Sequence, residues 1–369
     1  MAVATDVPVT EVETRTYTVP TDAPEGDGTL AWDSTTMVLV RLTGGGHTGI
    51  GWTYGPPAAA DVIRGELADV VRGRSCLDVQ SGYHAMVAAV RNAGRPGLVS
   101  MAIAAVDTAW WDLRARVLGL PLHRLLGAEA GAPVPVYGSG GFTTYDDRQL
   151  VRQCEEWGRL GVSYAKIKIG ESWGANTARD LARMRLARQT LGEDVELFVD
   201  ANGAFAPKQA VRLAAAAEDL RLTWFEEPVT SDDLDGLRWV REHVGPDVTA
   251  GEYGYDLTYF ERMCAAGAVD CLQVDVSRCG GITEWQRITA VAAAHHLPVS
   301  AHCAPALHLA VAAATPHLRH VEYFHDHVRI ESMFFDGPVT ATDGALHPGD
   351  GPGNGLSFRE SDAEKFRVG

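Results

Sequence analysis

The stretch YAKIKIG, residues 164–170, decides the fold of this chain because strands of similar character recur along most of the sequence. Its residues alternate, so Lys166 and Lys168 lie on one face of a short strand while Ile167 and Ile169 lie on the other. Two ammonium groups on one face need polar surroundings. The strand is therefore either a solvated edge or part of a binding site.

Seven further short strands are expected elsewhere in the chain. They begin at residues 134, 196, 223, 248, 271, 298 and 320, with the sequences VPVYGSGG, ELFVDAN, TWFEEP, VTAGE, CLQVDV, PVSAH and HVEYF. Together with position 164, consecutive starts lie 22 to 32 residues apart, which is room for one strand, one helix and two loops. Eight such units predict a closed parallel α/β barrel of the TIM type at residues 131–330, with any active site at the carboxyl ends of the strands.

Residues 1–130 follow a different pattern. The segments EVETRTYTVP and TTMVLVRLTGGGHTGIGWTYG alternate like antiparallel strands, whereas AADVIRGELADVVRG and LVSMAIAAVDTAWWDLRARVLG have helical periodicity. We therefore predict an α+β capping domain ahead of the barrel. Residues 331–369, which are rich in Gly and Pro, follow the eighth strand, and we expect them to return to the capping domain.

Composition excludes several classes of function. The chain of 369 residues is 46% apolar and carries 48 acidic against 32 basic residues, a net charge of -16 that argues against nucleic acid or an anionic membrane as a partner. Its six cysteines form no CxxC pair and no zinc-type cluster with histidine. With no secretion signal or membrane-spanning run apparent in the sequence, we expect a cytoplasmic protein.

Carboxylates end three consecutive strands of the predicted barrel. Asp200, Glu226 and Glu252 are spaced 26 residues apart, so the barrel would bring them to one rim. They would repel one another strongly unless a cation lies between them, and oxygen ligands favour a hard divalent ion such as Mg2+. Capping of the following helix is a reasonable alternative for any one of them but not for all three. Glu227 is a weaker candidate because adjacent strand residues point to opposite faces.

Basic groups are expected at the same rim. A lysine near a bound metal ion can have its pKa lowered and act as a base, which favours a functional role for Lys166 and Lys168, since a closed barrel has no edge strand. Across the barrel, Asp275 ends the sixth strand and His302 the seventh. A carboxylate beside an imidazole fixes its tautomer and produces an acid/base pair. Position singles out His302 among 13 histidines, many of which are structural or exposed.

These motifs together resemble the enolase superfamily, specifically its mandelate racemase subgroup. The resemblance covers nearly the whole chain, and the matching motifs are the helix at 102–127, KIK at 166–168, VDANGAF at 199–205, FEEP at 225–228, GE at 251–252, DVSRCGGIT at 275–283, SAH at 300–302 and HVEYF at 320–324. It implies a modified (β/α)7β barrel with an N-terminal α+β capping domain that is completed by the C-terminal segment.

The resemblance also implies roles for individual residues. Mg2+ would be bound by three carboxylates: Asp200, Glu226 and Glu252. Lys168 would be the base on one face of the substrate α-carbon, and His302, oriented by Asp275, would be the acid or base on the other face.

Substrate contacts are implied in the same way. Lys166, Asn202 and Glu322 match positions that contact the substrate carboxylate or its enolate, and Glu322 would have to be protonated to donate a hydrogen bond. Arg278 departs from the family pattern, in which a lysine is frequent at that place.

The implied reaction begins with Mg2+-dependent removal of the proton α to a carboxylate. If a β-hydroxyl is then expelled, the enzyme is a dehydratase that converts an acid sugar, an aldonate or aldarate, to a 2-keto-3-deoxy acid. This is the first choice, by family analogy. If His302 protonates the opposite face instead, the enzyme is a racemase or epimerase of a 2-hydroxy acid. A binding protein without activity is disfavoured by the intact set of ligands and bases.

Specificity is expected to lie in the first domain. Residues 20–35 and 51–55 have the composition of loops able to cover the barrel mouth. Candidates for contacting distal hydroxyls are Asp22, Glu25, Asp27, Trp32 and Tyr54. Because an acidic lid would repel a second terminal carboxylate, we expect a monoacid rather than a diacid. The resemblance further suggests a homo-oligomer, an octamer or a dimer.

Overall fold

The predicted barrel is confirmed by the computed structural model, which describes residues 6–369. Its eight parallel strands are β4 (Val134–Gly140), β5 (Tyr164–Lys168), β6 (Glu196–Asp200), β7 (Leu222–Glu226), β8 (Asp247–Ala250), β9 (Cys271–Val274), β10 (Val299–Ala301) and β11 (Leu318–Phe324). Each pairs with its neighbour in chain order, and β11 pairs with β4 to close the ring. Closure leaves no edge among these eight strands, so the two lysines of β5 face the barrel interior and not a solvated edge.

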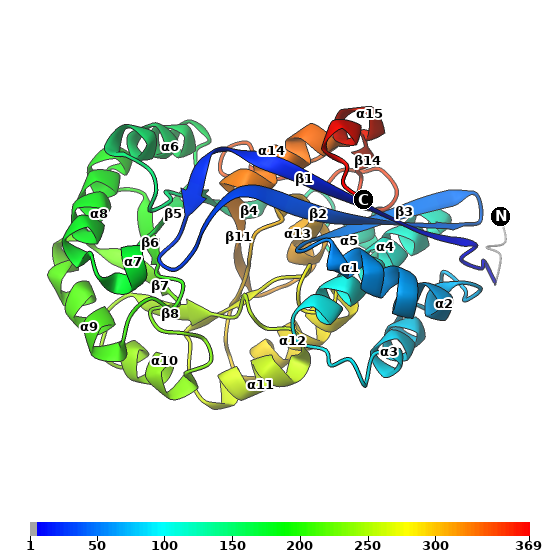
Figure 1. The fold of residues 1–369 in the computed structure, drawn as a ribbon, viewed down its shortest axis with the longest axis horizontal. Helices are drawn as coiled ribbons and strands as arrows, with labels where there is room; N and C mark the ends of the chain where they lie inside the picture. The colour runs from blue at the N-terminus through cyan, green and yellow to red at the C-terminus, as the bar shows by residue number, and fades with distance from the viewer. Residues whose placement is uncertain (1–5) are drawn as a thin grey trace.

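Helices surround the barrel (Figure 1). They are α6 (Asp147–Arg159), α7 (Glu171–Gly174), α8 (Thr177–Leu191), α9 (Pro207–Ala216), η2 (Glu218–Leu220), α10 (Leu234–Arg241), α11 (Leu257–Ala265), α12 (Ile282–Ala294), α13 (Pro305–Ala313) and α14 (His325–Phe334). Helix α6 illustrates why they form: Asp146 and Gln149 make a capping box, and Leu150, Cys154 and Trp157 are buried on one face. Helix α14 follows the eighth strand and leads into the C-terminal segment.

The first domain packs an antiparallel sheet on a long helix. The sheet consists of β1 (Glu11–Gly26), β2 (Ala31–Gly44) and β3 (His47–Tyr54), and the helices are α1 (Ala58–Val62), η1 (Ile63–Leu67), α2 (Ala68–Val71), α3 (Val79–Ala89), α4 (Leu98–Leu118) and α5 (Leu122–Leu125). Strand β3 lies so close to α4 that a Cβ at Gly49 or Gly51 would come within 2.3 Å of helix atoms. The glycines of this strand thus allow close packing. Helix α3 has no counterpart in the sequence prediction.

The expectation that residues 20–35 and 51–55 are loops is wrong. Most of residues 20–35 belongs to a hairpin in which β1 pairs with β2 as far as Gly26 and Ala31, across an irregularity between Pro20 and Glu25. Residues 51–54 belong to β3. Pairing with a neighbouring strand satisfies the backbone of these polar, Pro- and Gly-containing segments, and their composition does not reveal that partner. Figure 1 shows the hairpin lying across the barrel, with its turn near β5 and β6.

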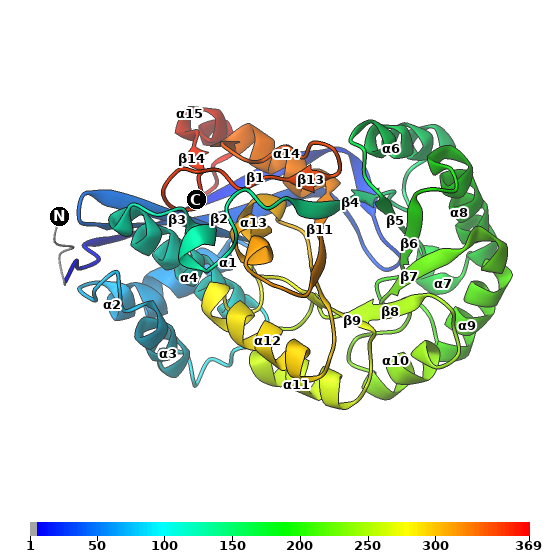
Figure 2. The ribbon, with the colours of Figure 1, turned by 180° about the vertical axis from the view of Figure 1, so that it is seen from behind.

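The C-terminal segment contacts the first domain. It contains β12 (Phe335–Asp336), β13 (Ala345–Leu346), β14 (Ser357–Phe358), α15 (Glu360–Ala363) and η3 (Glu364–Phe366), and its end lies beside the first-domain sheet in both views (Figures 1 and 2). The backbone N–H of Val368 donates to Thr16 O at 2.9 Å. Phe335 stacks on Trp52 with ring centroids 4.6 Å apart. On these contacts we propose that residues 331–369 complete the first domain.

Buried hydrogen bonds hold the first domain against the barrel. Asp107 of α4 accepts from Thr283, at the start of α12, through the backbone N–H at 2.9 Å and the hydroxyl at 2.6 Å. Thr53 of β3 donates to the carbonyl of Ser277 at 2.8 Å. These bonds set the first-domain sheet at a defined position over the barrel. Within residues 6–369, the helices include none that is both long and apolar enough to cross a membrane.

Candidate active site

Three carboxylates converge at the carboxyl ends of β6, β7 and β8. Asp200 and Glu226 are register partners at the ends of adjacent strands, and Glu252 follows β8. One ligand oxygen from each lies within 4.8 Å of the other two, and all three side chains are buried. The structure therefore brings together the three carboxylates that the sequence predicts at one rim.

The two lysines of β5 reach the same cluster. Lys166 Nζ lies 2.5 Å from Glu226 Oε1 and 2.8 Å from Glu322 Oε1, and Lys168 forms an ion pair with Asp200. Burial alone would lower the pKa of each lysine, but the attraction of the carboxylates outweighs it and raises the pKa above the usual value. The expected lowering of the lysine pKa concerns the site with its metal ion bound and stays a prediction. A divalent cation held by the same carboxylates would oppose their attraction.

The donor set fits a hard divalent ion. It consists of carboxylate oxygens, which Mg2+ prefers over nitrogen or sulfur. The buried atom Glu252 Oε2 finds no hydrogen-bond partner among residues 6–369, so this charged oxygen is available to a cation. The residues able to hold the ion are the same three: Asp200, Glu226 and Glu252.

An acid/base pair lies on the other side of the site. His302 Nδ1 is 2.8 Å from Asp275 Oδ2, while Asp275 Oδ1 accepts from the backbone N–H and hydroxyl of Ser277, each at 2.7 Å. Burial alone would raise the pKa of Asp275, but the hydrogen bond from His302 and nearby positive charge hold it well below the usual value. An ionised Asp275 orients the imidazole so that Nε2 faces the carboxylate cluster, 3.4 Å from Glu252 Oε2.

These groups open into one cavity of about 390 Å3 between the barrel and the first domain. Four of the predicted site residues line its barrel side: Lys168, Asn202, Glu252 and His302. Three predicted specificity residues line the other side: Asp27, Trp32 and Tyr54. The volume is within the range of small-molecule sites.

Two predicted specificity residues lie elsewhere. Glu25 is buried and accepts a hydrogen bond from Trp32 Nε1 at 2.8 Å, and its burial raises its pKa to about 8. Asp22 is exposed and lies 3.1 Å from His325 Nε2, away from the cavity. Neither is among the cavity-lining residues.

Glu322 accepts hydrogen bonds in this structure, and its protonation during turnover stays a prediction. Ser139 Oγ and the backbone N–H of Cys303 donate to it at 2.5 and 2.9 Å, and Lys166 pairs with it. Burial alone would raise the pKa of Glu322, yet the Lys166 ammonium outweighs burial and holds it well below the usual value. Glu322 is thus an ionised acceptor that positions Lys166.

Arg278 and Glu227 also lie near the site. Arg278 donates to the carbonyl of Glu252 at 3.2 Å and approaches the Asp275 carboxylate at 3.5 Å, so the guanidinium joins the two sides of the site. Glu227 is buried and lines a neighbouring cavity of about 550 Å3 that includes Asn202 and Tyr253. This location agrees with the prediction that Glu227 and Glu226 point to opposite faces.

Cys303 and His327 are among the residues of the cavity that the sequence prediction misses. Cys303 directly follows His302, and adjacency to a strand-end histidine was the available signal. His327 stacks on Tyr54 with ring centroids 3.5 Å apart, and burial lowers its pKa to about 3. No spacing in the sequence identifies His327, because α14 brings it to the cavity only through tertiary packing.

Comparison with known proteins agrees with this architecture. The family described as Enolase C-terminal domain-like matches residues 149–362, and the Mandelate racemase / muconate lactonizing enzyme, N-terminal domain family matches residues 10–127. The L-talarate/galactarate dehydratase of Salmonella typhimurium is 29% identical over 85% of this chain and 78% of its own. Other homologues are acid-sugar dehydratases and cycloisomerases.

Solved structures match along almost the whole chain. A mandelate racemase/muconate lactonizing enzyme-like protein from Rubrobacter xylanophilus is 46% identical with a TM-score of 0.94, covering 98% of this chain and 100% of its own. A racemase from Streptomyces coelicolor A3(2), solved with bound magnesium, is 28% identical with a TM-score of 0.91 over 98% of this chain and 100% of its own. This chain therefore belongs to the mandelate racemase/muconate lactonizing enzyme family and is an enzyme of the enolase superfamily.

Proposed function

We propose that this enzyme removes the proton α to the carboxylate of an acid sugar and dehydrates it to a 2-keto-3-deoxy acid. The observation that carries this proposal is that Lys168, His302 and Glu252 line one cavity, which joins a proton acceptor, a proton donor and the carboxylate cluster in a single site. The dehydratases among its homologues support the choice of reaction.

Mg2+ would be held by Asp200, Glu226 and Glu252, whose clustered oxygens fit it. When bound, the ion neutralises negative charge on the substrate carboxylate as the α-proton leaves. Lys166 would bind the same carboxylate, since its ammonium is fully buried and is held at the rim by Glu322. Asn202 would contribute from the loop after β6, where its backbone N–H donates to Asp200 Oδ1 at 2.9 Å.

Two side chains would move protons. Lys168 Nζ, as the neutral amine, would accept the α-proton. His302 Nε2 would give a proton to the β-hydroxyl, which leaves as water, and the resulting enol tautomerises to the keto acid. Asp275 would hold His302 in the required tautomer through the 2.8 Å contact at Nδ1. The α-proton remains on Lys168 and the hydroxyl leaves with the proton of His302; proton exchange with solvent restores both side chains, so the net loss is one molecule of water.

A racemase or epimerase of a 2-hydroxy acid is the second candidate. The presence of two separate proton-transfer groups, Lys168 and His302, in one cavity favours it, because inversion requires removal of a proton from one face and delivery to the other. The two functions differ in the fate of the β-hydroxyl. Loss of water produces a keto acid, whereas racemisation changes only optical rotation.

The preference for a monoacid is weaker than the sequence suggests. Of the three acidic candidates, Asp27 alone lines the cavity, and its Oδ1 accepts from the backbone N–H groups of Thr29 and Leu30 at 2.6 and 2.8 Å. The β1–β2 hairpin over the cavity therefore presents less free negative charge than a count of its acidic residues indicates. We retain aldonates as the first substrates to test and place aldarates beside them.

A stereochemically complete panel of aldonic and aldaric acids, incubated with the protein and Mg2+, tests the proposal. A carbonyl reagent detects keto acid, and product from one or a few members is expected. If no member of the panel yields a keto acid and α-deuterium is incorporated into a simple 2-hydroxy acid, the racemase is favoured. We also propose that the enzyme is cytoplasmic, which the six free cysteines of the described chain support. The family resemblance suggests a homo-oligomer, and light scattering after size exclusion tests the assembly.

A further inference from the structure

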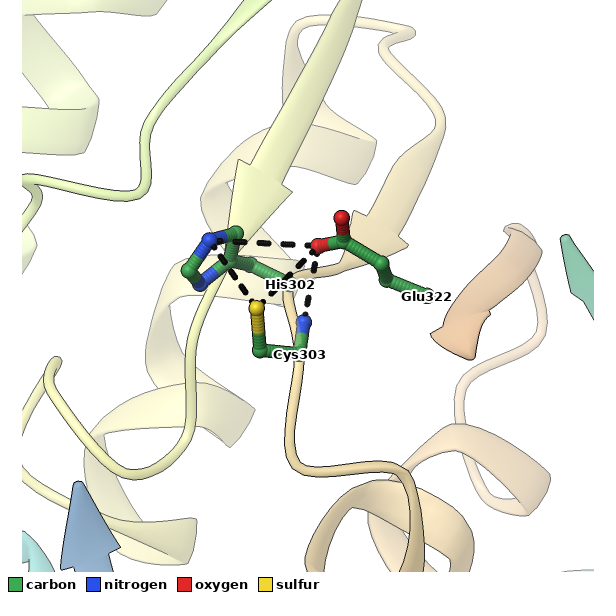
Figure 3. A group of neighbouring side chains, drawn as sticks. All are labelled: His302, Cys303 and Glu322. Atoms are coloured by element: carbon green, nitrogen blue, oxygen red, sulfur yellow. Dashed lines mark hydrogen bonds and ion pairs between the residues drawn. The ribbon is translucent and has the colours of Figure 1, made fainter. Parts of the chain in front are cut away.

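Cys303 belongs to a second group of metal-ligating side chains, distinct from the three carboxylates. Figure 3 shows His302, Cys303 and Glu322 turned toward one another. His302 and Cys303 directly follow β10, and Glu322 lies within β11. Cys303 Sγ lies 3.3 Å from His302 Nε2 and 3.5 Å from Glu322 Oε2, and these last two atoms are 3.8 Å apart. Among the residues that the structure describes, this is the only such group that includes a cysteine.

The three distances fit a tetrahedral ion of intermediate softness. With Zn–S near 2.3 Å and Zn–N and Zn–O near 2.0 Å, tetrahedral geometry places the ligand atoms about 3.3–3.5 Å apart. The two separations to sulfur, 3.3 and 3.5 Å, match this range, whereas the 3.8 Å between His302 Nε2 and Glu322 Oε2 must shorten by about 0.5 Å. Thiolate and imidazole ligands favour Zn2+ and Cd2+ over Mg2+, so this group and the carboxylate cluster select different ions.

Neighbouring groups already orient the ligand atoms. Asp275 holds His302 Nδ1, which is the arrangement in which a carboxylate turns the other imidazole nitrogen toward a metal. Ser139 and Lys166 contact Glu322 Oε1. Glu322 Oε2 accepts the backbone N–H of Cys303 at 2.9 Å and also faces the thiol. Glu252 Oε2, 3.4 Å from His302 Nε2, belongs to the carboxylate cluster, so the fourth position is left to a water molecule.

We propose that His302, Cys303 and Glu322 form a site for a thiophilic divalent cation, Zn2+ or Cd2+, that inhibits the enzyme by occupying His302 Nε2. The cation displaces the thiol proton of Cys303, which passes to solvent, and no oxidation occurs. Binding of the ion follows from the geometry alone. Inhibition rests on the proposed function, because it requires His302 Nε2 to transfer a proton during turnover.

Cadmium titration of the full chain in excess Mg2+ tests the site, since Mg2+ occupies the carboxylate cluster and the thiolate-to-cadmium absorbance reports sulfur ligation. The wild type is expected to develop this absorbance with one equivalent of Cd2+, and Zn2+ should reverse it. Cys303→Ser should abolish the absorbance, whereas Cys154→Ser, at another buried cysteine on α6, should retain it. Far-ultraviolet circular dichroism verifies that each variant folds.

A variant that keeps all three ligands provides an independent test. Asp275→Asn should retain the absorbance but weaken Cd2+ affinity by roughly 10–100-fold, the usual effect of removing the carboxylate behind a metal-bound histidine. Wild-type protein without the absorbance, or Cys303→Ser with it, overturns the site.

Inhibition is measured separately on any acid sugar that is turned over. Turnover should fall in step with the absorbance and return with a chelator selective for Zn2+. Undiminished turnover with Cd2+ bound would overturn the inhibitory role. Because cadmium absorbance needs no substrate, failure of the dehydratase proposal would leave the test of the metal site intact.

Discussion

The backbone N–H of Trp173 donates to the carbonyl of Gly28 at 2.9 Å, joining the tip of the β1–β2 hairpin to the short helix α7 that follows β5. A Cβ on Gly28 would lie 2.8 to 2.9 Å from the carbonyl oxygens of Ala201, Ile169 and Gly170. The hairpin tip thus rests directly on the backbone at the carboxyl ends of β5 and β6. This contact places Asp27 and Trp32 over the catalytic cavity.

Gly28→Ala should displace the hairpin tip and lower kcat/KM by about 10–100-fold, because a misplacement near 1 Å has effects of that size. Steady-state kinetics on the best substrate of the acid-sugar panel checks this. Gly65→Ala is the control, since a Cβ there meets nothing within 4 Å. Unchanged kinetics in Gly28→Ala would show that the tip does not position substrate contacts.

Turnover should fall by about 10²–10⁴-fold in the Lys168→Ala variant and in the His302→Asn variant, because each substitution removes one proton-transfer group. Both variants should remain folded. Turnover and circular dichroism are measured together. Lys208→Ala and His295→Asn replace exposed residues of the same types and should be active. Retained activity in either site variant would remove that residue from the mechanism.

Mg2+ should stabilise the wild type by about 2.7 kcal/mol at a concentration 100 times its Kd, because it binds the folded state selectively. Glu252→Gln should lose most of this gain, as it replaces a charged ligand of the carboxylate cluster. Thermal unfolding with and without Mg2+ provides the readout. Glu261→Gln, at an exposed position of α11, should respond like the wild type. Equal Mg2+ responses in both variants would contradict the assignment of Glu252.

Glu331 should make stability depend on pH. Its burial raises its pKa from 4.5 to about 8, although it accepts the backbone N–H of Ala306 at 2.9 Å. A raised pKa means that the folded state binds the proton more tightly. The contribution of Glu331 to the free energy of unfolding is therefore fully present below pH 4.5 and is lost as the pH rises through 8.

Glu331→Gln, which keeps a similar shape without the ionisation, should flatten this dependence and gain stability relative to the wild type between pH 5 and pH 8. Tm values across that range for both proteins provide the comparison. Parallel Tm curves would show that Glu331 does not titrate in this interval.

Much of the site was predictable because it depends on alternation within single strands and on the regular spacing of those strands along the chain. Side chains alternate along a strand, so the positions of Lys166 and Lys168 follow from the residues next to them. In a closed parallel barrel every strand ends at the same rim, so regular spacing alone brings Asp200, Glu226 and Glu252 together.

The sequence by itself thus determined the eight-stranded barrel, the carboxylate cluster and the Asp275/His302 pair. Tertiary structure alone decided that Glu25 is buried, that Glu322 is ionised and that the Cys303 thiol faces His302. Local periodicity determines which face of its own strand or helix a residue occupies. Burial, charge state and contact depend on groups that are far away in the sequence, such as Lys166 beside Glu322, and no pattern within a short segment contains that information.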